Sequence, residues 1–259
     1  MSLWIDQWRS FIKETSYKHI LTDKGISNDW FWQSYQVYDE VMRFSGYPGE
    51  IPSRISSFIR PDEVLLDIGA GTGAFAIPLA RVTKKVIAVD PSLYHQSLLA
   101  EKARKERLTN IVQIAKEWME ITPSEIGAVD HVLAAYSLFD EEIEAFLKKM
   151  IDISSKEVFM VFRAEKPDPL NEFAYGPRLS ADYQLLHHIL EDMGYSFRVE
   201  IFDRSYALPM DLVMKQYRFS NKSREDLEGF LRDEKRLIEK DDGSYATFCS
   251  KDALLHMIR

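Results

Sequence analysis

The feature that most limits the fold of this chain is a short apolar run that ends in three closely spaced glycines. Residues 64–73 read VLLDIGAGTG; a helix-like segment follows to residue 82, and a second apolar run at 85–89 ends at Asp90. A strand, a glycine turn, a helix and a strand in this order predict a βαβ unit, and so a parallel sheet. Pro78 fits the helix if the helix begins near Ala74, because a missing N–H costs least in the first turn.

The same alternation continues along the chain and predicts the fold class. Strands separated by helices of about 10–15 residues favour a mostly parallel sheet with helices on both faces. We expect an α/β, doubly wound sheet of seven strands, in which the late last strand is antiparallel. After the first two strands, the predicted strands cover residues 111–115, 129–135, 157–163, 195–203 and 245–249, and the predicted helices cover residues 92–107, 140–151 and 180–193.

The N-terminal region, residues 1–58, is predicted to form a helical cover. It holds four of the five tryptophans, and Trp4, Trp8 and Phe11 follow the i, i+4, i+7 spacing of one helix face. A second stripe of this kind covers residues 31–42. Such stripes usually pack on the next layer of the core, and a lid over a ligand is the alternative.

We predict one domain over residues 1–259. It consists of the N-terminal cover, a cofactor-binding half at 59–164, and substrate-side segments with the final strands at 165–259. Within the last part, a capping-box pattern at Ser223 and Asp226 predicts a helix whose apolar face extends to Ile238.

Composition excludes several classes of protein. The 41 acidic residues outnumber the 33 basic ones, and the net charge of −8 makes a nucleic-acid partner unlikely, because phosphate binding uses clustered Lys and Arg. The single cysteine excludes an intrachain disulfide framework and a multi-cysteine metal site, and it suits a reducing cytoplasm. We therefore expect no metal site. An apolar run of about 18 residues and a leader-like segment are both missing, so we expect no membrane association and a cytoplasmic location. The sequence leaves the oligomeric state open.

Two interpretations of the glycines imply different ligands. Gly69-x-Gly71-x-x-Ala74 fits a dinucleotide fingerprint, whereas Asp67-x-Gly69-x-Gly71-x-Gly73 fits a nucleoside site of different charge. A carboxylate at Asp67 would repel a pyrophosphate and favour a cationic ligand such as a sulfonium, if it faced the ligand. Its alternative role is to bond backbone amides and hold the turn. The chain also lacks the Tyr-x-x-x-Lys pair of short-chain reductases.

Four segments in order carry a resemblance to a known family. LLDIGAGTG, VIAVDPS, IAKEWMEI and VDHVLAAYSLF, within residues 61–163, resemble the motif series of class I S-adenosylmethionine-dependent methyltransferases. The resemblance implies a Rossmann-like fold, S-adenosylmethionine as the cofactor and in-line transfer of its methyl group. The alternatives are an NAD(P)-dependent oxidoreductase and a non-catalytic partner subunit that binds S-adenosylmethionine.

The resemblance also implies which residues bind the cofactor. The glycine turn would lie against the methionine portion, Asp90 would bind the ribose hydroxyls, and the two residues after it would flank the adenine. Glu117 would accept from the adenine amino group, Trp118 would offer a backbone amide, and the backbone after the strand at 129–135 would close the methionine side. The predicted cofactor-binding residues are Asp67, Gly69, Ala70, Gly71, Gly73, Asp90, Pro91, Ser92, Glu117, Trp118 and Ala135.

The methyl acceptor is predicted to be a small hydrophobic or aromatic molecule. The segment AAYSLF replaces the Asn/Asp-Pro-Pro-Tyr/Phe motif with which related enzymes hold planar amino nitrogens, and this argues against a DNA base. In-line transfer depends mainly on alignment and exclusion of water, so the sequence need not show a catalytic residue and we name none. Candidates to line the acceptor pocket or, for the histidines, to act as a base are Tyr35, Tyr38, Tyr136, Arg163, Tyr175, His187 and His188.

Overall fold

The computed structural model describes residues 2–16, 21, 25–34 and 37–258. Within them, one sheet has the strand order β3-β2-β1-β4-β5-β8-β6, and β7 pairs with β8 outside this path. The strands from β1 to β5 are parallel, and β8 runs antiparallel to β5, β6 and β7. This confirms the predicted fold class, with β7 as an additional strand. The strands are β1 Val64–Ile68, β2 Lys85–Val89, β3 Ile111–Ile114, β4 Val129–Ala135, β5 Ser154–Arg163, β6 Arg198–Pro209, β7 Leu237–Lys240 and β8 Gly243–Ile258.

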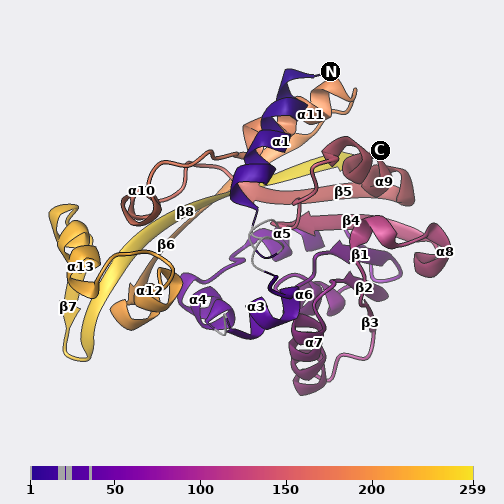
Figure 1. Ribbon diagram of the computed structural model, residues 1–259. Helices are drawn as coiled ribbons and strands as arrows, with labels where there is room; N and C mark the ends of the chain where they lie inside the picture. The colour runs from indigo at the N-terminus through magenta and orange to yellow at the C-terminus, as the bar shows by residue number, and fades with distance from the viewer. Residues whose placement is uncertain (1, 17–20, 22–24, 35–36, 259) are drawn as a thin grey trace.

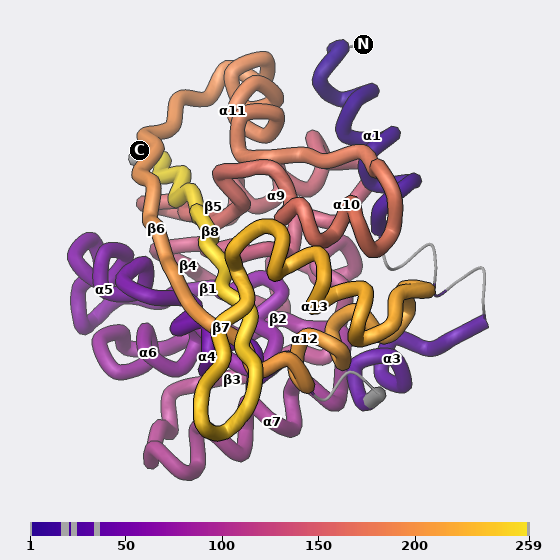
Figure 2. Tube along the Cα trace, turned by 90° about the vertical axis from the view of Figure 1, so that its left-hand side faces the viewer, coloured from indigo at the N-terminus to yellow at the C-terminus, as the bar shows by residue number. Residues whose placement is uncertain are grey.

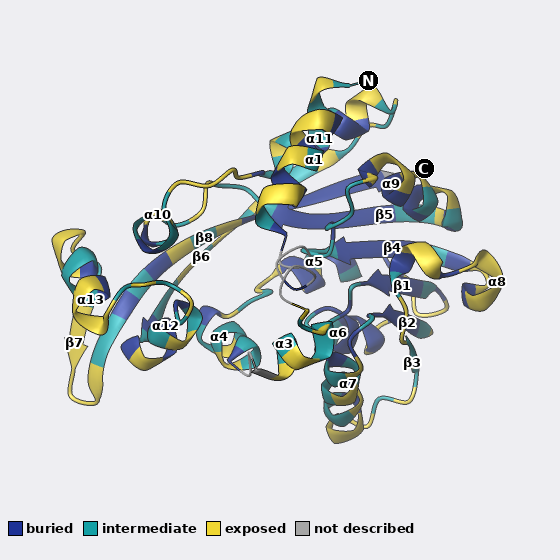
Figure 3. Ribbon diagram, in the orientation of Figure 1, coloured by how far each residue is buried: buried dark blue, intermediate teal, exposed yellow. Residues whose placement is uncertain are grey.

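Helices cover both faces of the sheet because its central strands are apolar on both sides (Figures 1 and 3). Along β5, Met160 and Phe162 belong to the core on one face, whereas Phe159 and Val161 belong to the core on the other. This period of two is the geometry of a pleated strand. The first face is covered by α1 Leu3–Thr15, α9 Ile143–Ile153 and α11 Tyr183–Asp192, and the second by α5 Ile51–Ser56, α6 Ala76–Ala80 and α7 Leu93–Lys105.

The N-terminal region divides into two parts with different roles. Helix α1 belongs to the core: Trp8 is fully buried, its indole N–H donates to the carbonyl of Asp140 at 2.9 Å, and its ring lies 5.9 Å from that of Phe162. The helices α3 Asn28–Ser34 and α4 Tyr38–Ser45 instead lie along the edge where β1 and β2 end (Figure 1). The core interpretation is confirmed for α1, whereas a lid formed by α3 and α4 over a ligand stays a prediction.

Two carboxylates attach α3 and α4 to the cofactor-binding half. Asp29 accepts from the hydroxyl of Ser92 at 2.6 Å, and Asp39 accepts from Thr72 at 2.6 Å and from Lys102 at 2.9 Å. Since Thr72 lies in the glycine turn and Ser92 follows the end of β2, these contacts attach α4 to the turn and α3 to the start of α7.

The long strands β6 and β8 extend beyond the rest of the sheet into an arm that has a core of its own. The arm is formed with α10 Pro169–Tyr175, α12 Met210–Gln216, α13 Arg224–Asp233 and β7 (Figures 1 and 2). The predicted helix through Ile238 is wrong in its second half. It ends at Asp233, Lys235 has φ +56°, and Leu237 begins a strand, because pairing with β8 satisfies the backbone there.

Other boundaries of strands and helices also differ from the predictions, and for β8 the reason is again strand pairing. β8 covers 16 residues instead of the five predicted, since it pairs with β5 along one edge and with β6 along the other. The short helices η1 Trp118–Glu120, α8 Pro123–Ile126, α10 and α12 were not predicted. None of the helices in the described part of the chain combines the length and apolarity needed to cross a membrane.

Candidate active site

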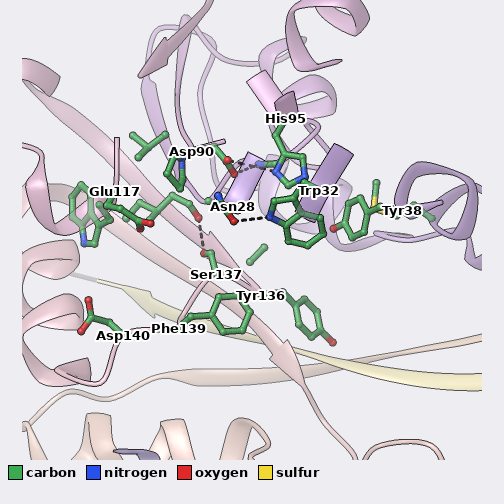
Figure 4. A pocket seen from close by; sticks show the side chains of 18 of the residues that line it. Asn28, Trp32, Tyr38, Asp90, His95, Glu117, Tyr136, Ser137, Phe139 and Asp140 are labelled. Atoms are coloured by element: carbon green, nitrogen blue, oxygen red, sulfur yellow. Dashed lines mark hydrogen bonds and ion pairs between the residues drawn. The ribbon is translucent and has the colours of Figure 1, made fainter. Parts of the chain in front are cut away.

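The candidate site lies at the carboxyl ends of β1, β2 and β4, where the strand order reverses on either side of β1. Ligands of open α/β sheets bind at such a switch point. A cavity of about 650 Å³ opens there, bounded by the strand ends on one side and by α3 and α4 on the other (Figure 4). Its size is within the range of small-molecule sites.

The three glycines of the turn have three different roles. All have positive φ: +72° at Gly69, +53° at Gly71 and +91° at Gly73. A Cβ on Gly69 would lie 2.2 Å from the Cβ of Ser137, and one on Gly73 would lie 2.4 Å from a methyl of Leu99. A Cβ on Gly71 would meet nothing closer than 4.0 Å. Gly69 and Gly73 therefore allow close packing, whereas Gly71 leaves space at the cavity wall.

Asp90 is held rigidly at the end of β2. One carboxylate oxygen accepts from the backbone N–H of Gly71 and the other from that of Ser92, both at 2.9 Å. The Nδ1 of His95 lies 3.5 Å from the second oxygen. A carboxylate oxygen can accept more than one hydrogen bond, so Asp90 keeps acceptor capacity on the side that lines the cavity.

Asp67 lies beneath the turn and not in the cavity wall. It is 2 % exposed, and burial, reinforced by the charge of Asp90, raises its pKa to about 7, although a hydrogen bond from the backbone N–H of Ala76 opposes the shift. The premise that Asp67 faces the ligand is therefore wrong, because the side chain points into the interior of the turn. The bond from Ala76 supports its alternative role of holding the turn.

The predicted cofactor residues separate into two groups by position. Those that line the cavity are Gly69, Gly71, Asp90, Pro91, Glu117, Trp118 and Ala135. Four others are absent from its lining because their side chains or Cα atoms pack inward, and these are Asp67, Ala70, Gly73 and Ser92. Ser92 instead caps α7, where its hydroxyl accepts from the backbone N–H of His95 at 3.2 Å.

The structure also adds residues that the sequence analysis missed. His95 is buried against the ring of Trp32, with 4.6 Å between ring centroids, and the indole of Trp32 donates to Asn28 at 3.0 Å (Figure 4). All three side chains line the cavity. The available signal was the position of His95 in the first turn of the helix after Asp90; nothing in the sequence indicated that Trp32 would lie against it.

The acceptor-site candidates are distributed over two cavities. Tyr38 and Tyr136 line the large cavity, whereas Arg163 and Tyr175 line a second cavity that also includes Tyr136. Tyr35 lies outside the described residues.

The two histidines on α11 lie elsewhere. Among the described residues, neither lines either cavity. His187 is 3.5 Å from Glu191, one turn along the same helix, and His188 stacks on Trp4 at 4.4 Å. The idea that one of them is the base is wrong for this geometry, because α11 covers the face of the sheet and not its edge.

Tyr136 is fixed between the two cavities in an unusual backbone conformation, with φ +52°. Its hydroxyl donates to Asp252, which is fully buried and is held in turn by Arg204 at 2.7 and 3.0 Å. Burial and then the charge of Asp252 raise the pKa of Tyr136 well above its usual value. The phenol is therefore protonated at neutral pH and does not serve as a general base.

The charges around the large cavity are mainly negative. Among the residues that the structure describes, its lining holds the carboxylates of Asp90, Glu117, Glu120 and Asp140 and a single arginine, Arg204, which is already bonded to Asp252. A pyrophosphate would meet repulsion in these surroundings, whereas a cationic ligand would be stabilised.

Comparison with known proteins identifies the family. Residues 65–156, which contain the glycine turn, Asp90 and Glu117, match the family described as "Methyltransferase domain". Over these residues the chain is similar to methyltransferase domains. This match supports the resemblance found in the sequence over the cofactor-binding half of the chain.

Individual proteins are similar to parts of this chain or to its fold. An uncharacterized protein of Haemophilus influenzae is 31 % identical over 102 residues, which are 39 % of this chain and 38 % of that one. A ribosomal protein L11 methyltransferase of Alkaliphilus oremlandii is 24 % identical over 157 residues, covering 56 % and 50 % of the two chains. The YcgJ protein of Bacillus subtilis has the same fold, with a TM-score of 0.58, 16 % identity and coverage of 80 % and 97 %. The chain spans half or less of the length of the first curated relatives that it matches.

Proposed function

We propose that this chain transfers the methyl group of S-adenosylmethionine to a small-molecule acceptor with an apolar or aromatic portion. The observation that carries the proposal is the composition of the large cavity, which is acidic at the strand ends and aromatic or aliphatic toward the N-terminal helices. The residues that line the apolar region near these helices are Tyr38, Val41, Met42 and Tyr47, and Phe139 from the segment after β4 adds a further ring to the cavity. Such a pairing fits a cationic cofactor beside a less polar acceptor.

The residues at the acidic end suit the cofactor in three ways. The open position at Gly71 lets the backbone approach a ligand closely. The carboxylate of Asp90 can accept from ribose hydroxyls, since its orientation is fixed by two backbone amides. Glu117 follows β3, the strand beside β2, and lines the same cavity as Asp90; it is proposed to accept from the adenine amino group (Figure 4). We retain the other predicted cofactor residues as supports of this surface.

The acceptor side is proposed to act by orientation and exclusion of water. The cofactor, when bound, supplies an electrophilic methyl group next to the glycine turn. Helices α3 and α4 cover this region, and Tyr47 packs against Tyr136 with ring centroids 5.9 Å apart, so the wall beside the acceptor is aromatic and rigid. Because Tyr136 retains its proton, we infer that it positions the acceptor and does not deprotonate it.

Binding of the cofactor tests the first part of the proposal. We expect titration calorimetry to detect S-adenosylhomocysteine binding, and we expect Asp90→Ala to weaken it at least tenfold, because the fixed ribose acceptor is lost. The matched control is Asp233→Ala, which removes an exposed carboxylate from α13 and should leave binding unchanged. A thermal unfolding curve for each variant separates lost binding from lost folding. Tight binding of NADPH with none of S-adenosylhomocysteine would contradict the proposal and favour an oxidoreductase.

The acceptor is tested with labelled cofactor. The chain is incubated with methyl-labelled S-adenosylmethionine and a metabolite extract, a protein extract or RNA in parallel, and label is expected in the small-molecule fraction. Label in protein alone would point instead to an activity like that named for the Alkaliphilus relative. Cofactor binding without any labelled product, together with a stable co-purifying protein, would favour a partner subunit. We place the reaction in the cytoplasm because the chain has a single cysteine.

A further inference from the structure

A second cavity, of about 330 Å³, adjoins the proposed methyl-transfer site. It shares Tyr136 and Tyr206 with the large cavity, so the two are neighbours across these side chains. Its walls come from the end of β5, the loop that follows, α10, and the adjacent parts of β6 and β8. An acceptor lying beside Tyr136 can therefore extend into this space.

The charge balance of the second cavity is opposite to that of the first. Three cationic residues, Arg163, Lys166 and Lys251, line it together with two acids, Glu165 and Asp168. Asp168 is already neutralised by Arg236, whose guanidinium donates to it at 2.6 and 3.0 Å from outside the lining. Counting this partner, the surroundings hold four cations and two carboxylates, and an anionic group would be stabilised there.

Among these cations, Arg163 has a side-chain N–H group without a hydrogen-bond partner among the described residues. It follows the buried end of β5, and its Nε atom is enclosed by protein but has no hydrogen-bond partner among the described residues. A buried, unpaired donor of a charged group is costly, and it leaves the charge of this guanidinium poorly compensated by the protein. Because Nε is enclosed, a ligand in the cavity would meet the terminal nitrogens, whose N–H groups form a fork that matches both oxygens of a carboxylate.

Tyrosines complete the polar wall around Arg163. Tyr175 stacks on Tyr217 with ring centroids 5.8 Å apart, and Tyr206 is within 3.2 Å of the hydroxyl of Ser250. Burial raises the pKa of all three phenols, which are therefore protonated donors at neutral pH. Hydroxyl groups beside an arginine can donate hydrogen bonds to an anionic oxygen, whereas an apolar group cannot accept them.

We propose that the second cavity binds a carboxylate of the methyl acceptor, with Arg163 as its main anchor, while the atom that receives the methyl group lies on the Tyr136 side of the large cavity. This rests on the proposed function and narrows its substrate class to small carboxylic acids with an apolar or aromatic body. Arg163 would then determine specificity without contacting the reacting atoms.

The proposal is tested with a pair of probes that differ only in charge. Full-length protein saturated with S-adenosylhomocysteine is titrated with 3-phenylpropanoate and with its neutral amide, 3-phenylpropanamide. We expect the acid to bind at least tenfold more tightly. Arg163→Gln should remove that preference while leaving the Kd of the amide and of S-adenosylhomocysteine within twofold. The control is Arg232→Gln, an exposed arginine on α13 that lines neither cavity and should preserve the preference.

A second variant protects the test against a folding defect in Arg163→Gln. Arg163→Lys keeps the charge but removes the fork, and we expect an intermediate preference for the acid. Equal binding of acid and amide, or no binding of either, by protein that binds S-adenosylhomocysteine would overturn the carboxylate site alone. Tighter binding of phenethyl phosphate than of the acid would overturn the choice of a carboxylate. If the natural protein does not bind S-adenosylhomocysteine, that result would instead contradict the proposed function itself.

Discussion

At the scale of single residues, the raised pKa of Asp67 makes the stability of the protein depend on pH. Its carboxyl group is buried, and its Oδ2 atom has no hydrogen-bond partner among the described residues. The raised pKa of about 7 means that the native protein binds more protons than the unfolded chain between about pH 4 and pH 7. Stability from this group is therefore lost as the pH rises through that window.

The variant Asp67→Asn tests this linkage. The amide keeps the shape of the side chain and an acceptor for the N–H of Ala76 but carries no charge at any pH. We expect the unfolding free energy of the variant, relative to the natural protein, to rise by about 1–3 kcal/mol between pH 5 and pH 8. Urea denaturation followed by circular dichroism at several pH values measures it, with the exposed Asp62→Asn as control. A difference that does not change with pH would show that Asp67 is ionised throughout.

At the scale of elements, different glycines of the turn are expected to determine the stability of the protein and its affinity for the cofactor. Gly71→Ala places a methyl group where the nearest described atom is 4.0 Å away, so the cost to stability is about 1 kcal/mol from the positive φ. The same methyl group occupies the proposed cofactor surface, and we expect affinity for S-adenosylhomocysteine to fall at least tenfold. Calorimetry and thermal unfolding of the same sample measure both quantities. An unchanged affinity would place the cofactor elsewhere.

Gly73→Ala is the matched substitution with the opposite expectation. Its methyl group would overlap Leu99 and Ile77, at 2.4 and 2.9 Å, in addition to the strain at φ +91°. We expect a loss of about 2–4 kcal/mol in the free energy of unfolding, by the same measurements. The fraction that remains folded should bind S-adenosylhomocysteine within threefold of the natural protein. A stable variant with lost binding would contradict this division of roles.

The elements that were predictable are those whose signal is local. Alternating apolar runs and helices located β1 to β5 because each of these strands contains a short apolar run, although β3 is only half-buried, and β4 matches at both ends. The end of α13 and the existence of β7 depend on pairing with β8, which no local pattern around Leu237 reveals. Likewise, β8 was predicted too short because its length is set by two partner strands.

The candidate site was predictable to the extent that backbone turns form it. Seven of the 11 residues expected to bind the cofactor line the cavity, and these lie at or just after the ends of β1, β2, β3 and β4. The condition that Asp67 face the ligand is not met, and the backbone hydrogen bond that it accepts from Ala76 forms only in the folded turn. The contacts of Trp32 with His95 and of Tyr136 with Asp252 join distant segments, and sequence spacing does not report them.

At the scale of the whole molecule, segments near both ends of the chain form part of the core and of the sheet. Helix α1 packs on the same core as β4 and β5, and β8 is the partner that β5 and β6 share. The arm adds a separate apolar cluster, and its inner end forms one wall of the second cavity. The cofactor is therefore proposed to bind to the regular sheet, and the acceptor to what the termini and the arm add to it.

The role of α1 leads to a prediction for the cooperative unit of folding. Trp8 is fully buried against Phe162 of β5, so Trp8→Ala should cost about 3–5 kcal/mol in the free energy of unfolding. Trp30→Ala, which removes a ring that is 57 % exposed, should change it by less than about 0.5 kcal/mol. If α1 belongs to the core, hydrogen exchange in Trp8→Ala accelerates in β4 and β5 as well as in α1. Acceleration confined to residues 3–15 would mean that α1 is an attached cover whose loss leaves the sheet and the cofactor site unaffected.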